Sequence, residues 1–141
     1  MFHIQIFTIG KNKETWLTQA LLEYQKRLQS QFSFTWKLVK NDQELLSTTS
    51  KESRLICLDS SGIIFSSEEF SHILFQQLEK HGCKLNFVIG GSEGIPKALL
   101  DRADLIWSFS KLTFTHQQVR LILLEQIYRA SEIQKGSQYH K

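Results

Sequence analysis

Apolar positions follow two different periods along this chain, and the change of period separates short strands from longer helices. Short apolar or alternating runs, bounded by turn residues, predict strands. They cover residues 2–9, 34–39, 54–59, 85–89 and 105–109. The run 85–89 is almost entirely apolar, as is typical of a strand that is covered on both faces of a sheet.

Apolar residues three or four positions apart predict helices between these strands. The helices cover residues 16–30, 66–81, 96–103 and 115–136. Two of them begin with a capping box, Ser66-x-x-Glu69 and Thr115-x-x-Gln118, in which each end satisfies an amide of the other. Residues 60–62 predict a turn, and the polar stretch 40–53 a loop or a short helix. Alternating strands and helices predict a single α/β domain over residues 1–141, with a mostly parallel sheet and flanking helices.

Length and composition are those of a small globular protein. The chain has 141 residues, one proline, two cysteines and a net charge of +3. Cys57 and Cys83 show neither a CxxC nor a zinc-binding spacing, so we expect reduced thiols, no metal site and a cytoplasmic location. The first residues lack the features of a signal peptide, and no apolar run is long enough to span a membrane.

Charge is distributed unevenly along the chain. Residues 1–54 carry 8 basic and 5 acidic side chains, residues 55–96 carry 2 and 5, and residues 97–141 carry 7 and 4. A basic C-terminal third suits a partner that bears phosphate groups, although +3 is small for a dedicated nucleic-acid-binding protein. Charge alone therefore leaves the class of partner open.

The glycine-rich turn 90–94 is the first candidate site. Ligands of parallel α/β sheets bind beyond the carboxyl ends of the strands, and Gly90-Gly91-Ser92-Glu93-Gly94 follows such an end. The turn lacks the spacing of a Walker A loop or a dinucleotide-binding turn, but it matches the G-x-S-x-G pattern of serine hydrolases. A hydrolase with Ser92 as nucleophile, Asp101 or Asp104, and His116 or His140 is therefore one alternative.

Two further segments carry candidate chemistry. Residues 108–115 alternate hydroxyl and apolar side chains, as a slot for an adenine ring requires, and the helix after them places His116 and Arg120 on one face. The chain ends in Tyr139-His140-Lys141, whose aromatic, imidazole and ammonium groups suit contacts with RNA bases and phosphates. A non-catalytic RNA-binding module is therefore a second alternative.

Together these residues resemble the RlmH family of SPOUT methyltransferases, over essentially the whole chain. The family's motifs occur in order and at the family's spacings, at residues 9–11, 24–28, 89–94, 108–114, 116, 120, 125–130 and 139–141. The resemblance implies a SPOUT fold with a C-terminal trefoil knot, a homodimer with the site between subunits, and S-adenosyl-L-methionine as cofactor. It also implies methylation of N3 of a pseudouridine in the helix 69 loop of 23S ribosomal RNA, on assembled ribosomes.

The resemblance assigns roles residue by residue. It implies that His116, Arg120, Tyr139 and His140 act on the substrate side, with the tail serving the partner subunit's site. The implied cofactor-binding residues are Leu58, Gly90, Phe109, Ser110, Lys111, Leu112, Thr113 and Phe114.

The reaction needs a group that takes the proton from N3. Either His116 or His140 can do so, and Arg120 or Lys141 can stabilise the resulting anion or bind phosphate. Relatives often carry proline at the positions of Thr115 or Gln117 and of Gln138, so we expect a more mobile loop and tail in this chain.

Overall fold

The sheet contains five parallel strands in the order β2-β1-β4-β3-β5. This computed structural model describes residues 1–140, and the side chains of residues 1–139. The strands are β1 (Phe2–Ile9), β2 (Phe32–Val39), β3 (Leu55–Ile64), β4 (Lys84–Ile89) and β5 (Leu105–Ser108). The predicted α/β class with a parallel sheet is confirmed.

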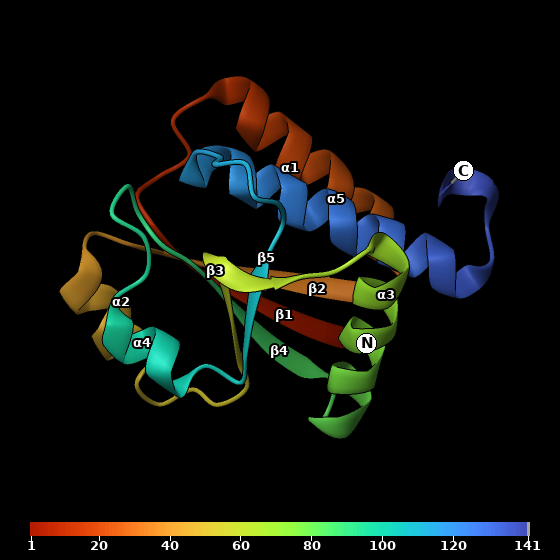
Figure 1. Cartoon of the computed structure of the whole chain (residues 1–141). Helices are drawn as coiled ribbons and strands as arrows, with labels where there is room; N and C mark the ends of the chain where they lie inside the picture. Colours follow the sequence, from red (N-terminus) through yellow and green to blue (C-terminus); the bar gives the residue numbers. More distant parts are fainter. Residues whose placement is uncertain (141) are drawn as a thin grey trace.

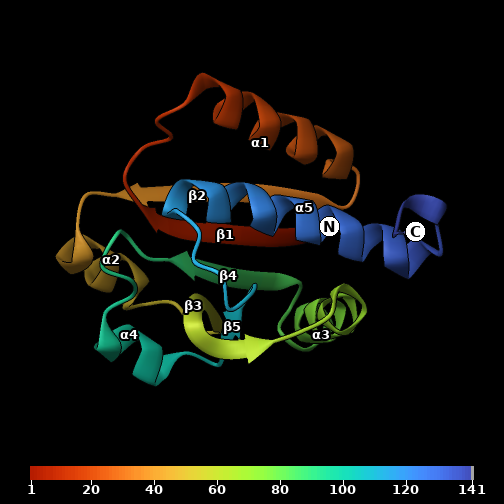
Figure 2. The same cartoon turned by 45° about the horizontal axis from the view of Figure 1, so that its top comes forward.

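Helices cover both faces of the sheet, as Figures 1 and 2 show. One face carries α1 (Thr15–Leu28), α3 (Ser67–Lys80) and α5 (His116–Lys135), and the other carries α2 (Asp42–Thr49) and α4 (Lys97–Arg102). Both predicted capping boxes are present, at the starts of α3 and α5. A 3-10 helix, η1 (Gln138–His140), follows α5 at the end of the chain.

The central strand β4 explains why the core has two halves. Leu85, Phe87 and Ile89 point into the cluster beneath α1, α3 and α5, whereas Val88 points into the cluster beneath α2 and α4. All four side chains are buried. Successive residues of a strand face opposite sides of the sheet, so a strand covered on both sides is apolar throughout.

The predicted turn at residues 60–62 is wrong, because β3 continues to Ile64. Its pairing with β5 shifts register between Leu58 and Ile63, which marks a bulge rather than a strand end. A Cβ at Gly62 would lie 2.5 Å from the Ile106 carbonyl group, so only glycine allows the two strands this approach. The turn-like sequence therefore bends the strand without ending it.

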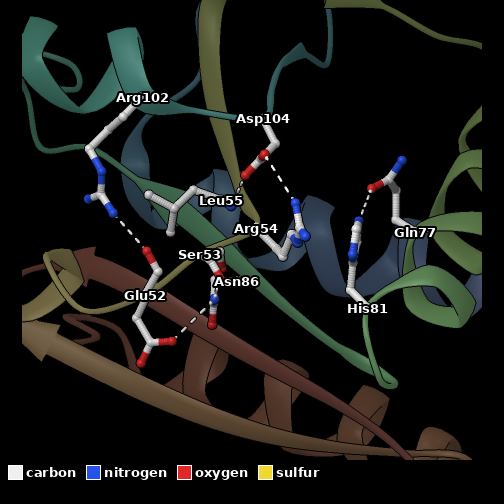
Figure 3. Close-up of polar contacts among 9 residues, drawn as sticks. All are labelled: Glu52, Ser53, Arg54, Leu55, Gln77, His81, Asn86, Arg102 and Asp104. Atoms are coloured by element: carbon white, nitrogen blue, oxygen red, sulfur yellow. Dashed lines mark hydrogen bonds and ion pairs between the residues drawn. The ribbon is translucent and has the colours of Figure 1, made fainter.

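Side chains fix the chain at the amino edge of the sheet, where β3 begins (Figure 3). Arg102 donates hydrogen bonds to the carbonyl oxygens of Thr49 at 3.1 Å and Glu52 at 2.7 Å. The buried Asn86 donates to the Ser53 carbonyl oxygen at 2.7 Å and to the Glu52 carboxylate at 3.4 Å. The segment before β3 is thereby tied to α4 and β4.

The residue before β3 has an unusual backbone conformation. Arg54 has a φ of +61°, which is uncommon for a residue with a side chain. The Asp104 carboxylate accepts a hydrogen bond from the Leu55 amide at 2.8 Å and lies 3.9 Å from the Arg54 guanidinium (Figure 3). These contacts hold the left-handed residue at the start of the strand.

The described part of the chain contains no membrane-spanning helix and no cluster of metal-binding side chains. None of its helices has the length and apolar character needed to cross a membrane. Within the same residues, no three side chains of His, Cys, Asp or Glu gather as a metal site would require. Cys57 and Cys83 are free thiols, and burial raises the pKa of Cys57 to about 12.

Candidate functional site

A cavity of about 370 Å³ lies where β4 and β5 end and where β3 bulges after Leu58. These strands are neighbours in the sheet, so the bulge of β3 and the turns after β4 and β5 meet at one edge. The volume falls within the usual range of small-molecule sites. The lining comprises Leu58, Asp59, Ser60, Ile89, Gly90, Gly91, Ser92, Glu93, Gly94, Trp107, Ser108, Phe109, Ser110, Leu112, Thr113, Phe114, His116 and Val119.

The glycine turn gives the cavity a wall made of backbone. A Cβ at Gly90 would lie 2.4 Å from the carbonyl carbon of Gly94, so the two ends of the turn can approach only without a side chain there. Gly94 has a φ of +83° and its amide donates to the Gly91 carbonyl oxygen at 3.0 Å. A ligand can therefore lie directly against main-chain groups.

The loop after β5 is organised by its own hydroxyl groups. Ser108 Oγ donates to the Ser110 carbonyl oxygen at 2.9 Å, and Ser110 Oγ accepts from the Leu112 amide at 3.0 Å. Leu112 is nevertheless 71% exposed, although it is a large apolar residue. An apolar side chain presented at the rim of a cavity is suited to cover a flat apolar ligand group.

Seven of the eight cofactor-binding residues implied by the resemblance line this cavity. They are Leu58, Gly90, Phe109, Ser110, Leu112, Thr113 and Phe114. Lys111, the eighth, is an exposed residue of the same loop whose side chain is not part of the lining. The arrangement brings the residues together as expected, while their contacts with a cofactor stay a prediction.

Trp107, which no sequence motif marked as a site residue, also lines the cavity. The indole ring of Trp107 stacks on Phe70 at 4.0 Å and meets the edge of Phe109 at 4.7 Å, measured between ring centroids. Its buried Nε1 has no hydrogen-bond partner among the described residues. The one available signal was the position of Trp107 near the carboxyl end of a predicted strand.

The two carboxylates in the cavity lining favour a ligand group with positive charge. Asp59 and Glu93 belong to the lining, which includes no lysine or arginine among the described residues. His116 also lines the cavity, and its pKa is lowered by burial and then by the charges of Arg120 and Lys13. The imidazole is therefore neutral at pH 7 and can accept a proton.

Arg120 lies behind the cavity wall and is fully buried. Its guanidinium donates to Asn12 Oδ1 at 2.7 Å and to the carbonyl oxygens of Ile9 and Gly10, both at 2.8 Å. Burial lowers its pKa to about 10, so it stays charged at neutral pH. The structure thus joins Arg120 to the loop after β1.

Thr115 and Gln117, the positions where the resemblance leads us to expect proline, each make specific hydrogen bonds. Thr115 Oγ1 accepts from the Gln118 amide at 3.1 Å, as the first residue of the capping box. Gln117 bonds the loop after β1, accepting from the Lys13 amide at 3.2 Å and donating to the Lys11 carbonyl oxygen at 3.0 Å.

Ser92 lines the cavity, but its surroundings are not those of an activated nucleophile. No hydrogen bond joins its hydroxyl to a histidine or a carboxylate among the described side chains. A serine nucleophile needs such a base within hydrogen-bond reach. The geometry therefore gives the hydrolase alternative no support.

The C-terminal residues lie at the opposite end of α5 from His116 (Figure 1). Tyr139 donates from its hydroxyl to the Glu125 carboxylate at 3.1 Å and packs edge-on against Tyr128 at 4.8 Å. Burial and the charge of Glu125 raise the pKa of Tyr139 to about 12. The side chain of His140, and Lys141, lie outside the described part of the structure.

The fold and the cavity define a family, which comparison with known sequences identifies. The sequence model described as "Predicted SPOUT methyltransferase" matches residues 2–140, so the chain belongs to the SPOUT methyltransferase family. It is 49% identical, over the full length of both chains, to "Ribosomal RNA large subunit methyltransferase H" of Protochlamydia amoebophila. The protein of the same name from Streptococcus mutans is 39% identical over 98% of this chain and 99% of its own. The resemblance to the RlmH family is confirmed.

Solved structures agree on the fold. A probable methylase family protein from Haemophilus influenzae superposes with a TM-score of 0.60 at 10% identity, over 98% of this chain and 70% of its own. A probable methyltransferase from Bordetella pertussis gives 0.59 at 10% identity, over 91% of this chain and 95% of its own. At such identity the likeness concerns the fold alone.

Proposed function

We propose that the protein methylates N3 of a pseudouridine in the helix 69 loop of 23S ribosomal RNA, using S-adenosyl-L-methionine and acting on assembled ribosomes in the cytoplasm. The names of the relatives support a ribosomal RNA substrate. One structural observation carries the proposal. A single cavity is lined by seven of the eight implied cofactor residues, which come from β3, the glycine turn after β4 and the loop after β5, and its lining includes His116.

The chemistry of the lining fits the cofactor. S-adenosyl-L-methionine, when bound, supplies a methyl group activated by a positively charged sulfur. Leu112 and Phe114 provide apolar surfaces for the adenine ring, and the main chain of residues 90–94 provides hydrogen-bonding groups. Asp59 and Glu93 provide negative charge next to a cationic ligand. These residues would hold the cofactor.

The protein's own contribution to the chemical step is alignment and proton transfer. The N3–H group of a uracil-type ring is weakly acidic, so its proton needs an acceptor before or during methyl transfer. We assign this role to His116, because its lowered pKa leaves the imidazole unprotonated at neutral pH. The positive charges of Arg120 and Lys13, which lower that pKa, also favour an anionic ring beside His116.

We further propose a knotted homodimer in which the tail of each subunit completes the other site. Tyr139 packs on Tyr128, which lies twelve residues along α5 from His116, or about 18 Å at the rise of an α-helix. A tail held there is distant from its own cavity, so the partner subunit's Tyr139 and His140 are the groups available to it. Trp16 of α1, 53% exposed, offers apolar surface for pairing.

The decisive experiment is methylation of ribosomes that lack the modification, with isolated 23S RNA as the control. We expect incorporation of a labelled methyl group into the ribosomes, located at the helix 69 loop by a stop in reverse transcription, because an N3 methyl group blocks the pairing edge. Labelling at another nucleotide would contradict the proposed substrate, and no labelling of either RNA would contradict the activity.

Cofactor binding separates the transferase from the two alternatives. We expect S-adenosylhomocysteine to raise the thermal midpoint of unfolding, because a ligand that binds only the folded state stabilises it. A non-catalytic RNA-binding module would bind ribosomes without this shift. A hydrolase would lose ester cleavage in Ser92→Ala, whereas the proposed transferase has no ester-cleaving activity to lose.

A further inference from the structure

The loop between β1 and α1 carries two exposed cations beside the cavity. Lys11 and Lys13 are both exposed, and Lys13 is close enough to His116 to contribute to the lowered pKa of that imidazole. Glu14, the carboxylate of the same loop, forms the amino-terminal boundary of α1. Phosphate groups dominate the affinity of proteins for nucleic acids, and exposed lysines are the side chains that pair with them as point charges.

Helix α5 holds this loop through Gln117. The side-chain amide of Gln117 donates to the Lys11 carbonyl oxygen at 3.0 Å, and its oxygen accepts from the Lys13 amide at 3.2 Å. The two bonds fix the backbone on both sides of Asn12. Since Gln117 follows His116 directly, one turn of helix sets the position of the imidazole and of the loop together.

Arg120, another residue of α5, also holds this loop. It donates to the carbonyl oxygens of Ile9 and Gly10 and to the Asn12 side chain, and no carboxylate pairs with it among the described residues. Burying a charge without an ion-pair partner opposes folding. The buried guanidinium therefore anchors the last residue of β1 and the loop that follows it.

We propose that Lys11 and Lys13, in the loop between β1 and α1, bind the phosphate backbone of the RNA substrate, and that Gln117 and Arg120 are positioning residues that hold Lys13 beside His116. The inference rests on the proposed function, because the RNA is the substrate of the neighbouring cavity. It adds a contact surface, the loop between β1 and α1, which is held by the same turns of α5 that carry the proton acceptor. The position of the loop and the position of the proton acceptor His116 would then both depend on α5.

Lys13→Ala tests the phosphate contact, with Lys80→Ala as the matched control. Lys80 is an exposed lysine in the last turn of α3, at the opposite edge of the sheet. Binding to purified large ribosomal subunits is measured over a series of potassium chloride concentrations. We expect Lys13→Ala to reduce the slope of log affinity against log salt by about 1, the signature of one lost phosphate contact.

The control should leave that slope unchanged, and S-adenosylhomocysteine should shift the melting midpoint of both variants as it does in the wild type. An unchanged slope in Lys13→Ala, or an equal reduction in Lys80→Ala, would overturn the assignment of a phosphate contact to this loop.

Gln117→Ala tests positioning, with Gln134→Ala as its control. Gln134 is also a glutamine of α5, and it bonds Gln31 at the far end of the helix. We expect Gln117→Ala to accelerate hydrogen exchange of the Lys13 amide and to weaken ribosome binding several-fold, while Gln134→Ala does neither. Faster exchange without weaker binding would show that the bonds are merely structural. Asn12→Ala provides the same comparison for the Arg120 anchor without removing the buried charge.

The wild-type protein separates failure of this inference from failure of the proposed function. If it methylates ribosomes and Lys13→Ala keeps the full salt dependence, the loop proposal is wrong and the function stands. If it neither binds S-adenosylhomocysteine nor methylates RNA, the proposed function fails and the loop proposal falls with it.

Discussion

The two edges of the sheet contain similar residue types but arrange them in opposite ways. At the amino edge, Asn86, Arg102 and Asp104 bond the main chain and side chains of their neighbours. At the carboxyl edge, the cavity presents Asp59 and Glu93, the imidazole of His116 and the exposed Leu112. The amino edge uses its polar groups to fix the fold. At the carboxyl edge Asp59 accepts hydrogen bonds from Ser61, whereas the side chains of Glu93 and His116 have no hydrogen-bond partner among the described residues and are available to a ligand.

A smaller cavity at the amino edge shows that a hollow alone does not make a site. It measures about 220 Å³ and includes Arg54, Asp104 and Gln77 in its lining. Each of these is already engaged, because Arg54 and Asp104 pair at 3.9 Å and Gln77 bonds His81 at 3.1 Å (Figure 3). The smaller cavity thus holds an ion pair and an engaged amide, whereas the larger one holds Glu93 and His116, whose side chains have no hydrogen-bond partner among the described residues.

The largest effect is expected from His116→Gln. Removal of a general base usually slows a reaction by about 100-fold or more, so single-turnover methylation of ribosomes should fall accordingly. Asp59 and Glu93 lie in the same cavity, but the net influence on His116 lowers its pKa. Wild-type activity should therefore fall only when the pH drops below 6.5, and the variant should lose this acid limb. An unchanged rate and pH profile would remove His116 as the base.

Gly90→Ala should have the next largest effect. The new Cβ would meet the Gly94 carbonyl carbon at 2.4 Å, and the displaced turn should slow methylation by about 100-fold, the cost of a misplacement of about 1 Å. Gly91→Ala is the matched variant, because its Cβ would meet only the Ile9 side chain at 3.6 Å. Equal losses of thermal stability and cofactor binding in both variants would refute this packing argument.

Asn86→Ala should damage the fold and spare the site. The change removes the partner of the Ser53 carbonyl oxygen and of the Gln5 amide, at a cost of about 2 kcal/mol in the free energy of unfolding. Denaturant titration measures this loss, and the affinity for S-adenosylhomocysteine should not change. Lys84→Ala at the same edge breaks only an exposed ion pair with Glu52 and should cost about 1 kcal/mol or less. Loss of cofactor affinity in Asn86→Ala would contradict the separation of the two edges.

Leu112→Ala should have the smallest effect. In contrast to Asn86→Ala, it should weaken cofactor binding and leave the stability of the fold unchanged. Because the side chain is 71% exposed, the unfolding free energy should change by less than about 0.5 kcal/mol. Calorimetric affinity for S-adenosylhomocysteine should fall about fivefold, as expected for about 1 kcal/mol of lost apolar contact. Leu38→Ala, at an exposed position of β2, should change neither quantity. A destabilised Leu112→Ala with normal affinity would make this residue part of the fold.

The sequence by itself determined the elements and the edge at which to look. The apolar run 85–89 predicted a strand covered on both faces, and both capping boxes formed at the predicted residues. These features are encoded locally. The alternation of side chains along a strand, and the bonds between the first and fourth residues of a capping box, both involve residues of one element. The motif spacings also predicted the family that the comparisons confirm.

Only the tertiary structure decided which groups meet. Spacing along α5 placed His116 and Arg120 on one face, but the folded chain exposes the imidazole to the cavity and buries the guanidinium against the loop after β1. The continuation of β3 past Asp59 likewise depended on contact between Gly62 and Ile106, residues far apart in sequence. Burial and partner choice arise from contacts between distant segments, which no local pattern contains.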